Sequence, residues 1–221
     1  NPEANAFFDI KASKLKFIFP QPGPIEGVKS KSKALMKLVH TDFTYPGNTI
    51  PTLFDISIQV SMRSRVGCVG ENGAGKSTFL KLLTGKLTAT TGEIVTNPDF
   101  KLAYFGQHST KELSMDETPF EFMCRMFPEE NPGLLSKHLS KTSVTGDSRN
   151  TRMIGLSYSQ RSCVIFAKLT YVPPHLLIMD EPTNFLDLDS VDSLIAATNK
   201  FTGALLVVTH SRHFLKSCAN Q

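Results

Sequence analysis

The chain has 221 residues, of which 40% are hydrophobic and 20% charged, as is usual for a globular protein large enough for one α/β core. No stretch reaches the roughly 18 apolar residues of a membrane span, and the four cysteines lack the CxxC spacing of a zinc site or disulfide framework. We therefore expect a cytoplasmic protein without a membrane partner. The net charge of +4 arises within residues 1–40, where seven lysines stand against three acidic residues.

Residues 1–34 are rich in proline, glycine, lysine and serine, and they predict a basic linker with one short strand at 15–19. The lysines of this segment would either contact RNA phosphates or form a solvated face, and both alternatives stay open. The sequence has neither an initiator methionine nor a secretion signal. We expect it to be part of a longer protein.

From residue 35 onward, apolar residues recur with the spacing of strands and helices. The predicted elements are strands at 35–43, 53–60 and 65–69, a helix at 77–83, strands at 93–96 and 101–105, helices at 118–127, 134–140 and 160–169, a strand at 176–179, a helix at 190–199 and a strand at 204–209. The runs at 176–179 and 204–209 are almost continuously apolar, which indicates strands buried on both faces of a parallel sheet. This alternation predicts an α/β fold of the P-loop class.

The strongest motif is the phosphate loop, residues 70–77, with the spacing G-x-x-x-x-G-K-S between a predicted strand and a predicted helix. Gly73 and Gly75 can adopt backbone angles closed to other residues, so that successive N–H groups point toward phosphate oxygens. Lys76 would bring its charge to the β and γ phosphates, and the Ser77 hydroxyl would bind Mg²⁺. The residues expected to surround the phosphates are contiguous: Gly70, Glu71, Asn72, Gly73, Ala74, Gly75, Lys76, Ser77 and Thr78.

The second motif is the apolar strand at 176–179, which runs into Asp180 and Glu181. Ligands of open α/β sheets bind at the carboxyl ends of the strands, so these acids should face the phosphate loop. Asp180 would hold Mg²⁺, and Glu181 would polarise the attacking water. The two motifs together predict an ATPase that uses Mg·ATP.

The order and spacing of the motifs resemble those of an ATP-binding cassette (ABC) over about residues 35–215. The matching positions are residues 70–77, Gln107, the signature segment at 156–160, Asp180 with Glu181, residues 184–187 and His210. The resemblance implies a mixed-sheet core with an antiparallel β edge and a small helical subdomain at about 108–170. It places the nucleotide-binding domain at 35–221, truncated before the last strands of the family.

The resemblance also implies roles for single residues. Tyr45 corresponds to the aromatic residue that stacks on adenine, with Phe43 as the other candidate. Gln107 corresponds to the residue that senses Mg²⁺ and the attacking water, so it is expected both at the metal and in catalysis with Glu181. His210 corresponds to the histidine that contacts the γ-phosphate. Asp187 corresponds to the acid that bridges two cassettes.

The signature segment departs from the family pattern. The family has Leu-Ser-Gly-Gly-Gln, whereas this chain has Leu156-Ser157-Tyr158-Ser159-Gln160. Ser157 and Gln160 are retained and are expected to contact nucleotide bound to the partner cassette. Because side chains replace both glycines, we expect the composite site that this segment completes to be degenerate.

Asn184, the linker-like start and residues 127–139 resemble the soluble ABC-F translation factors, in particular the second cassette of the eukaryotic general-control and elongation factor 3-like branch. This resemblance implies a Mg-dependent ATPase that closes with a second cassette of the same longer chain and acts on the ribosome. Two alternatives remain open. One is the nucleotide-binding subunit of an ABC transporter, and the other is a nucleotide-gated module that does not hydrolyse ATP.

Overall fold

The structure is a computed structural model that describes residues 15–26, 28 and 30–219. The first part of the predicted basic linker, residues 1–14, lies outside the described residues. The strands are β1 (Ala34–Phe43), β2 (Leu53–Ser61), β3 (Arg65–Cys68), β4 (Thr91–Thr96), β5 (Leu102–Phe105), β6 (Leu176–Asp180) and β7 (Ala204–Val208). The helices are α1 (Lys76–Leu83), α2 (Pro119–Met126), α3 (Pro132–Lys141), α4 (Asp147–Asn150), α5 (Tyr158–Tyr171), α6 (Leu188–Lys200) and α7 (Arg212–Ala219), with 3₁₀ turns η1 (Ser109–Glu112) and η2 (Met153–Gly155).

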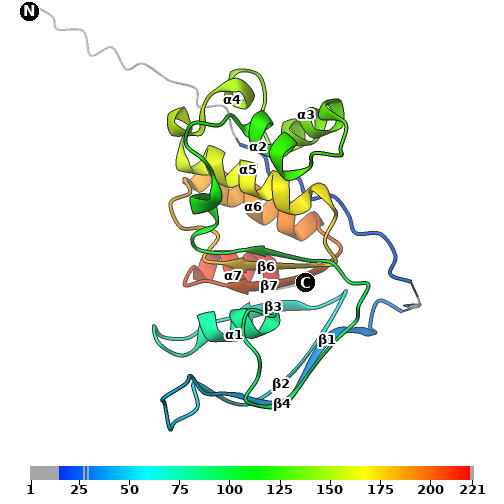
Figure 1. Cartoon of the computed structure of the whole chain (residues 1–221), viewed down its shortest axis with the longest axis vertical. Helices are drawn as coiled ribbons and strands as arrows, with labels where there is room; N and C mark the ends of the chain where they lie inside the picture. Colours follow the sequence, from blue (N-terminus) through cyan, green and yellow to red (C-terminus); the bar gives the residue numbers. More distant parts are fainter. Residues whose placement is uncertain (1–14, 27, 29, 220–221) are drawn as a thin grey trace, which may run out of the picture.

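Two sheets make up the β-structure. Strands β3, β7, β6 and β5 form a parallel sheet in that order, and β2, β1 and β4 form an antiparallel sheet. Figure 1 shows α5 and α6 on one side of the parallel sheet, with α2, α3 and α4 beyond them, and α1 between the two sheets. The antiparallel strands expected at the edge of a mixed sheet thus form a sheet of their own.

The parallel sheet places the carboxyl ends of its strands at one edge. Every residue of β6 and β7 is buried, which explains their continuous apolar runs. The register pairs Asp180 at the end of β6 with Val208 at the end of β7, and Phe105 of β5 with Met179 of β6. The segments that follow β3, β5, β6 and β7 therefore meet at this edge, as expected for a ligand site.

Most predicted elements agree with the structure to within two residues, but some predictions were wrong. Residues 15–19 form no strand, and α7, α4 and the two 3₁₀ turns were not predicted. Every residue of 108–170 is described and none lies in a strand. Helix α5 begins within the signature segment, where Ser157 and Gln160 form a capping box: the Gln160 N–H donates to Ser157 Oγ and the Ser157 N–H donates to Gln160 Oε1.

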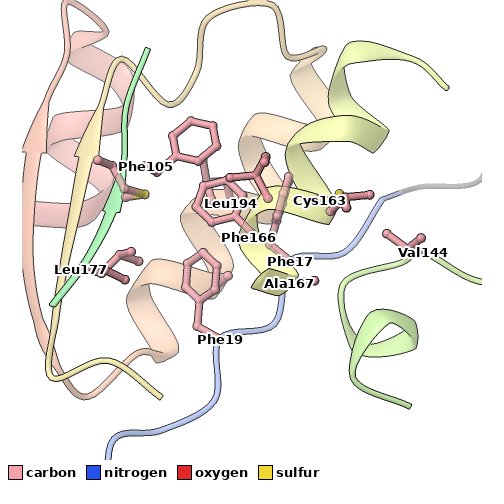
Figure 2. Packing of buried hydrophobic residues seen from close by; sticks show 14 of the residues in the cluster. Phe17, Phe19, Phe105, Val144, Cys163, Phe166, Ala167, Leu177 and Leu194 are labelled. Atoms are coloured by element: carbon pink, nitrogen blue, oxygen red, sulfur yellow. The ribbon is translucent and has the colours of Figure 1, made fainter. Parts of the chain in front are cut away.

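The N-terminal segment, residues 15–26, packs into the core although it falls within the predicted linker. Phe17 and Phe19 are each 4% exposed, and both rings lie 5.3 Å from the ring of Phe166 on α5. Figure 2 shows the three rings together in the core beside the parallel sheet. The molecule has a second hydrophobic core, which lies between the two sheets. Further along the segment, Ile25 is buried in this second core. The segment therefore connects both cores.

Hydrogen bonds hold this segment to distant parts of the chain. The Lys16 N–H donates to Ser143 Oγ at 2.6 Å, and the Phe17 N–H donates to Ser193 Oγ on α6 at 3.0 Å. The Gln21 amide donates to the carbonyl of Lys200 at 2.9 Å and accepts from the Thr202 N–H at 2.7 Å. An extended segment needs partners for its own backbone groups, and the Lys16 and Phe17 N–H groups find them in these two serine hydroxyls. The Gln21 side chain adds two further bonds that hold the segment in place.

Replacing Phe17 with alanine is expected to lower the free energy of unfolding by about 3 kcal/mol, since it leaves a cavity beside Phe166. Ile18 is the matched control, because it is 50% exposed and its replacement by alanine should change stability by less than about 0.5 kcal/mol. Urea denaturation of the two variants measures both values. Equal stability of the two variants would contradict the packing of this segment.

Candidate functional site

A cleft of about 580 Å³ opens at the carboxyl edge of the parallel sheet. The predicted site residues that line it are Tyr45, Asn72, Gly73, Gly75, Lys76, Ser77, Thr78, Gln107, Asp180, Glu181 and His210, and it is also lined by Thr52 and Asn184. Gly70, Glu71 and Ala74 belong to the phosphate loop but do not line the cleft, and neither do Ser157 and Gln160. The structure therefore gathers most of the predicted site from five separate segments of the chain.

The backbone of the phosphate loop requires glycine at two positions. Gly73 has φ +86° and Gly75 has φ +91°, a left-handed conformation that other residues rarely adopt. A Cβ atom on Gly75 would also lie 2.9 Å from Leu53 Cδ2 and 3.1 Å from the carbonyl oxygen of Thr52. Helix α1 begins directly after Gly75, so the positive end of its dipole faces the cleft. A helix N-terminus behind a glycine turn is suited to bind phosphate.

Lys76 lies folded over the phosphate loop. Its ammonium group donates to the carbonyl oxygens of Gly70 at 2.6 Å and Glu71 at 2.8 Å. Both acceptors are neutral, whereas phosphate oxygens are charged and bind ammonium more strongly. Lys76 is therefore held at the cleft by bonds that a triphosphate can replace.

Tyr45 and Phe43, the two candidates for the adenine contact, have different environments. Phe43 is 5% exposed and packs in a small core with Leu53. The Tyr45 ring stands edge-on to Phe43 with the centroids 4.8 Å apart, and its hydroxyl lies 3.1 Å from Thr78 Oγ1. Of these two residues, Tyr45 lines the cleft and Phe43 does not, so the Tyr45 ring is the one of the two that can contact a nucleotide base.

Asp180 lies at the end of β6 in a partly desolvated position. Burial, and next the neighbouring charge of Glu181, raise the pKa of Asp180 above its usual value. The Tyr104 hydroxyl on β5 donates to Asp180 Oδ2 at 3.4 Å. Burial also raises the pKa of Tyr104 to about 12, so its hydroxyl is a donor at neutral pH. A nearby cation would compensate the cost of keeping Asp180 ionised.

Glu181 is fixed by its backbone and by one carboxylate oxygen. It has φ +50°, rare for a residue with a side chain, and its N–H donates to the Val208 carbonyl at 2.8 Å. Oε2 accepts from the Thr209 hydroxyl at 3.2 Å and the His210 N–H at 3.4 Å. Oε1 is buried without a hydrogen bond, 3.5 Å from His210 Nε2. A buried carboxylate oxygen without a donor is a good acceptor for an ordered water molecule.

The cleft fits a magnesium ion held together with phosphate oxygens. Ser77, Gln107 and Asp180 contribute a hydroxyl, an amide and a carboxylate, and Mg²⁺ prefers such oxygen donors. No group of three or more His, Cys, Asp or Glu side chains among the described residues could hold a metal. The donors present therefore suit Mg²⁺ that arrives with a nucleotide, and they do not form a cage for a metal alone.

The family comparison agrees with this geometry. The ABC transporter family matches residues 53–184, which include the phosphate loop, Gln107 and the two acids. The chain belongs to this family. It is an ABC cassette, and ABC cassettes are ATPases. Within the described residues, no helix combines the length and apolar character needed to cross a membrane.

Curated relatives of the cassette include ABC-F and elongation factor 3 proteins. ABC transporter F family member 3 of Arabidopsis thaliana is 36% identical over 207 residues, which are 93% of this chain and 28% of that protein. An uncharacterized ABC transporter ATP-binding protein of Schizosaccharomyces pombe is 39% identical over 209 residues, 94% of this chain and 27% of that protein. Elongation factor 3 of Zygosaccharomyces rouxii is 27% identical over 330 aligned positions, which cover 100% of this chain and 32% of that protein. The chain thus spans about a third or less of these relatives.

Solved structures show the same fold. The ATP-binding cassette MJ0796, in a dimeric structure described as a post-hydrolysis state bound to ADP and Pi, superposes with a TM-score of 0.70 at 20% identity. The match covers 82% of this chain and 90% of that chain. A second dimeric structure of MJ0796 gives a TM-score of 0.69 at 19% identity.

The signature segment of the cassette lies away from its own cleft. The Tyr158 ring lies 5.0 Å from the Phe185 ring, and the Ser159 hydroxyl donates to Asp187 Oδ2 at 3.3 Å. The other oxygen of Asp187 accepts from the Ser190 N–H at 2.8 Å and caps α6. The two side chains that replace the family's glycines therefore join the signature segment to the segment after β6.

Sequence reasoning missed several residues of the site. Thr52 and Asn184 line the cleft but were not named as site residues. Tyr104 on β5 contacts Asp180, and Thr209, directly after β7, contacts Glu181. Thr209 could have been found because it is the polar last residue of a predicted buried strand and directly precedes His210. No local signal identifies Tyr104, because its contact with Asp180 depends on β5 lying beside β6.

Proposed function

We propose that this cassette binds and hydrolyses Mg·ATP as one half of a cassette pair in an ABC-F protein that acts on the ribosome in the cytoplasm. The observation that carries the proposal is the cleft itself, where the phosphate loop, Asp180, Glu181 and His210 line one space. The ABC-F and elongation factor 3 names of its relatives support the ribosomal role. A transporter subunit remains the alternative, because the matching family is named for transporters.

In this proposal each side chain of the cleft has one task. The phosphate-loop amides and Lys76 bind the triphosphate, and Tyr45 stacks on adenine. Bound Mg²⁺ would neutralise phosphate charge, with Ser77, Gln107 and Asp180 as the residues that hold it. Glu181 Oε1 accepts a hydrogen bond from the attacking water, and His210 contacts the γ-phosphate. Hydrolysis and phosphate release then reopen the pair, so the cycle alternates two surfaces toward a partner.

A partner cassette is supported by the apolar residues around the signature segment. Ile154 is 68% exposed, Phe185 74% and Leu188 83%, and the Tyr158–Phe185 ring contact joins the signature segment to the segment after β6. Exposed apolar side chains grouped in this way are typical of an interaction surface. These relatives are more than three times as long as this chain, which leaves room for a second cassette.

We also propose that the signature segment completes a slow or inactive composite site. Tyr158 and Ser159 add side chains where the family brings bare backbone toward the γ-phosphate. Replacing both by glycine in the cassette pair is expected to raise ATP turnover, with ATP binding to this chain's own phosphate loop unchanged. Phosphate release and ATP binding measured in parallel test this. Unchanged turnover would contradict the proposed degenerate site.

The ribosomal role is tested by co-sedimentation of the full-length protein with ribosomes in the presence of Mg·ATP. Binding that weakens steeply with salt supports contacts to RNA phosphates. The transporter alternative predicts instead that the protein fractionates with membranes and stays there at high salt. ATP binding without measurable phosphate release would favour the module that does not hydrolyse ATP.

A further inference from the structure

We propose that Tyr104 and Thr209 are positioning residues that hold the two carboxylates of the site in different roles. Tyr104 would fix Asp180 for the metal, and Thr209 would fix Glu181 for the water. This inference rests on the proposed Mg·ATP site and adds two residues to it. The two hydroxyls come from opposite sides of β6, since Tyr104 lies on β5 and Thr209 follows β7.

The Tyr104 ring is confined where its hydroxyl reaches Asp180. The hydroxyl donates to Asp180 Oδ2 at 3.4 Å, and the ring lies under the Lys86 ammonium, 5.1 Å from its centroid. Gly106 leaves space for the ring, because a Cβ atom at that position would lie 2.8–2.9 Å from atoms of the Tyr104 side chain. The ring also packs against the buried core between the two sheets, which limits its other rotamers and keeps its hydroxyl directed at one oxygen of Asp180.

The Thr209 hydroxyl is also committed to one direction. It accepts a hydrogen bond from the Ser211 N–H at 3.1 Å and donates its only proton to Glu181 Oε2 at 3.2 Å. Thr209 is 2% exposed, so water does not compete for this proton. With Oε2 engaged in this way, Oε1 is the oxygen of Glu181 that remains buried without a donor.

The hydrogen bonds from Tyr104 and Thr209 orient two carboxylates that repel each other. Asp180 and Glu181 are consecutive and repel each other, which contributes to the raised pKa of Asp180. A hydroxyl donor on one oxygen of each carboxylate reduces its rotation, and the two donors lie on opposite sides of the strand. Groups that orient metal ligands in this way usually change metal affinity or activity about 10–100-fold when removed.

For Asp180 the test is Tyr104→Phe, with Mn²⁺ as a probe for Mg²⁺. The titration of ATP-loaded protein with Mn²⁺, followed by electron paramagnetic resonance, is expected to show about tenfold weaker Mn²⁺ binding in the variant. Tyr171→Phe is the matched control, because its hydroxyl also donates to a carboxylate, that of Glu130 at 2.8 Å, outside the cleft. Mn²⁺ affinity of Tyr104→Phe within twofold of the wild type would overturn the assignment of Tyr104.

For Glu181 the test is Thr209→Val, which keeps the shape of the side chain and removes the hydroxyl. Its kcat is expected to fall about tenfold with KM and Mn²⁺ affinity within twofold, and Thr209→Ser is expected to restore kcat. Thr198→Val is the control, since its buried hydroxyl bonds Ile195 and Cys218 outside the cleft. Thr209→Ala is made in parallel in case valine prevents folding. Unchanged kcat in the variant that folds, or no recovery with serine, would overturn the assignment of Thr209.

The same titrations separate this inference from the proposed function. If the wild-type protein binds neither ATP nor Mn²⁺ with ATP, the proposed function fails and the inference fails with it. If the wild type binds both and hydrolyses ATP while the variants behave like it, the positioning roles alone are wrong.

Discussion

ATP binding is expected to weaken by about 30-fold or more when Lys76 is replaced with alanine, because a hydrogen-bonded charge pair contributes on the order of 2–5 kcal/mol. In the structure the Lys76 ammonium is already beside the phosphate loop, held by the carbonyls of Gly70 and Glu71. Phosphate oxygens of a bound nucleotide would replace these neutral acceptors. Equilibrium dialysis with labelled ATP measures the effect.

Lys81→Ala is the control for this experiment. Lys81 lies in the last turn of the same helix, α1, is exposed and does not line the cleft. Its replacement removes the same charge from the protein, so a general electrostatic effect on ATP would appear in both variants. Affinity of Lys76→Ala close to that of Lys81→Ala would contradict the phosphate-binding role of Lys76.

Glu181→Gln is expected to slow ATP hydrolysis by about 10²–10⁴-fold while ATP binding stays within about twofold, since a general base contributes to the transition state and little to binding. Glutamine keeps the side-chain volume and can still accept from the Thr209 hydroxyl, whereas its amide is a poor base. ATP then remains bound, and the closed cassette pair persists. Single-turnover phosphate release and ATP binding measure the two quantities separately.

Glu130→Gln is the matched control, because Glu130 is exposed and does not line the cleft. It should hydrolyse ATP at the wild-type rate. If Glu181→Gln also cycles at that rate, Glu181 is not the group that polarises the attacking water, and Gln107 and His210 remain as the candidates in the cleft.

The parts of the site that depend on local backbone conformation could be predicted from the sequence. The phosphate loop needs left-handed glycines at fixed positions, and Gly73 and Gly75 have that conformation. Strands β6 and β7 were predicted because burial on both faces leaves a continuous apolar run, and the acids follow directly in the chain. Once a parallel sheet is assumed, the meeting of these segments at one edge follows.

Features that depend on distant partners could not be predicted. Phe17 and Phe19 lie in a proline-rich stretch, and only the position of Phe166 on α5 explains their burial. Helix α7 is short and carries basic and polar residues, and it is anchored by Phe214, which is completely buried. The contact between Tyr104 and Asp180 joins residues 76 positions apart and requires the order of the strands. Local patterns contain none of this information.

The docking of the N-terminal segment determines how a mechanical load enters the protein. Phe17 packs against Phe166 on α5, and the Gln21 side-chain amide donates a hydrogen bond to the carbonyl at the end of α6. Both residues precede β1 along the chain. Tension applied upstream of residue 15 therefore reaches the helix that starts at the signature segment before it reaches either sheet. A force on that end would therefore act first on helices α5 and α6.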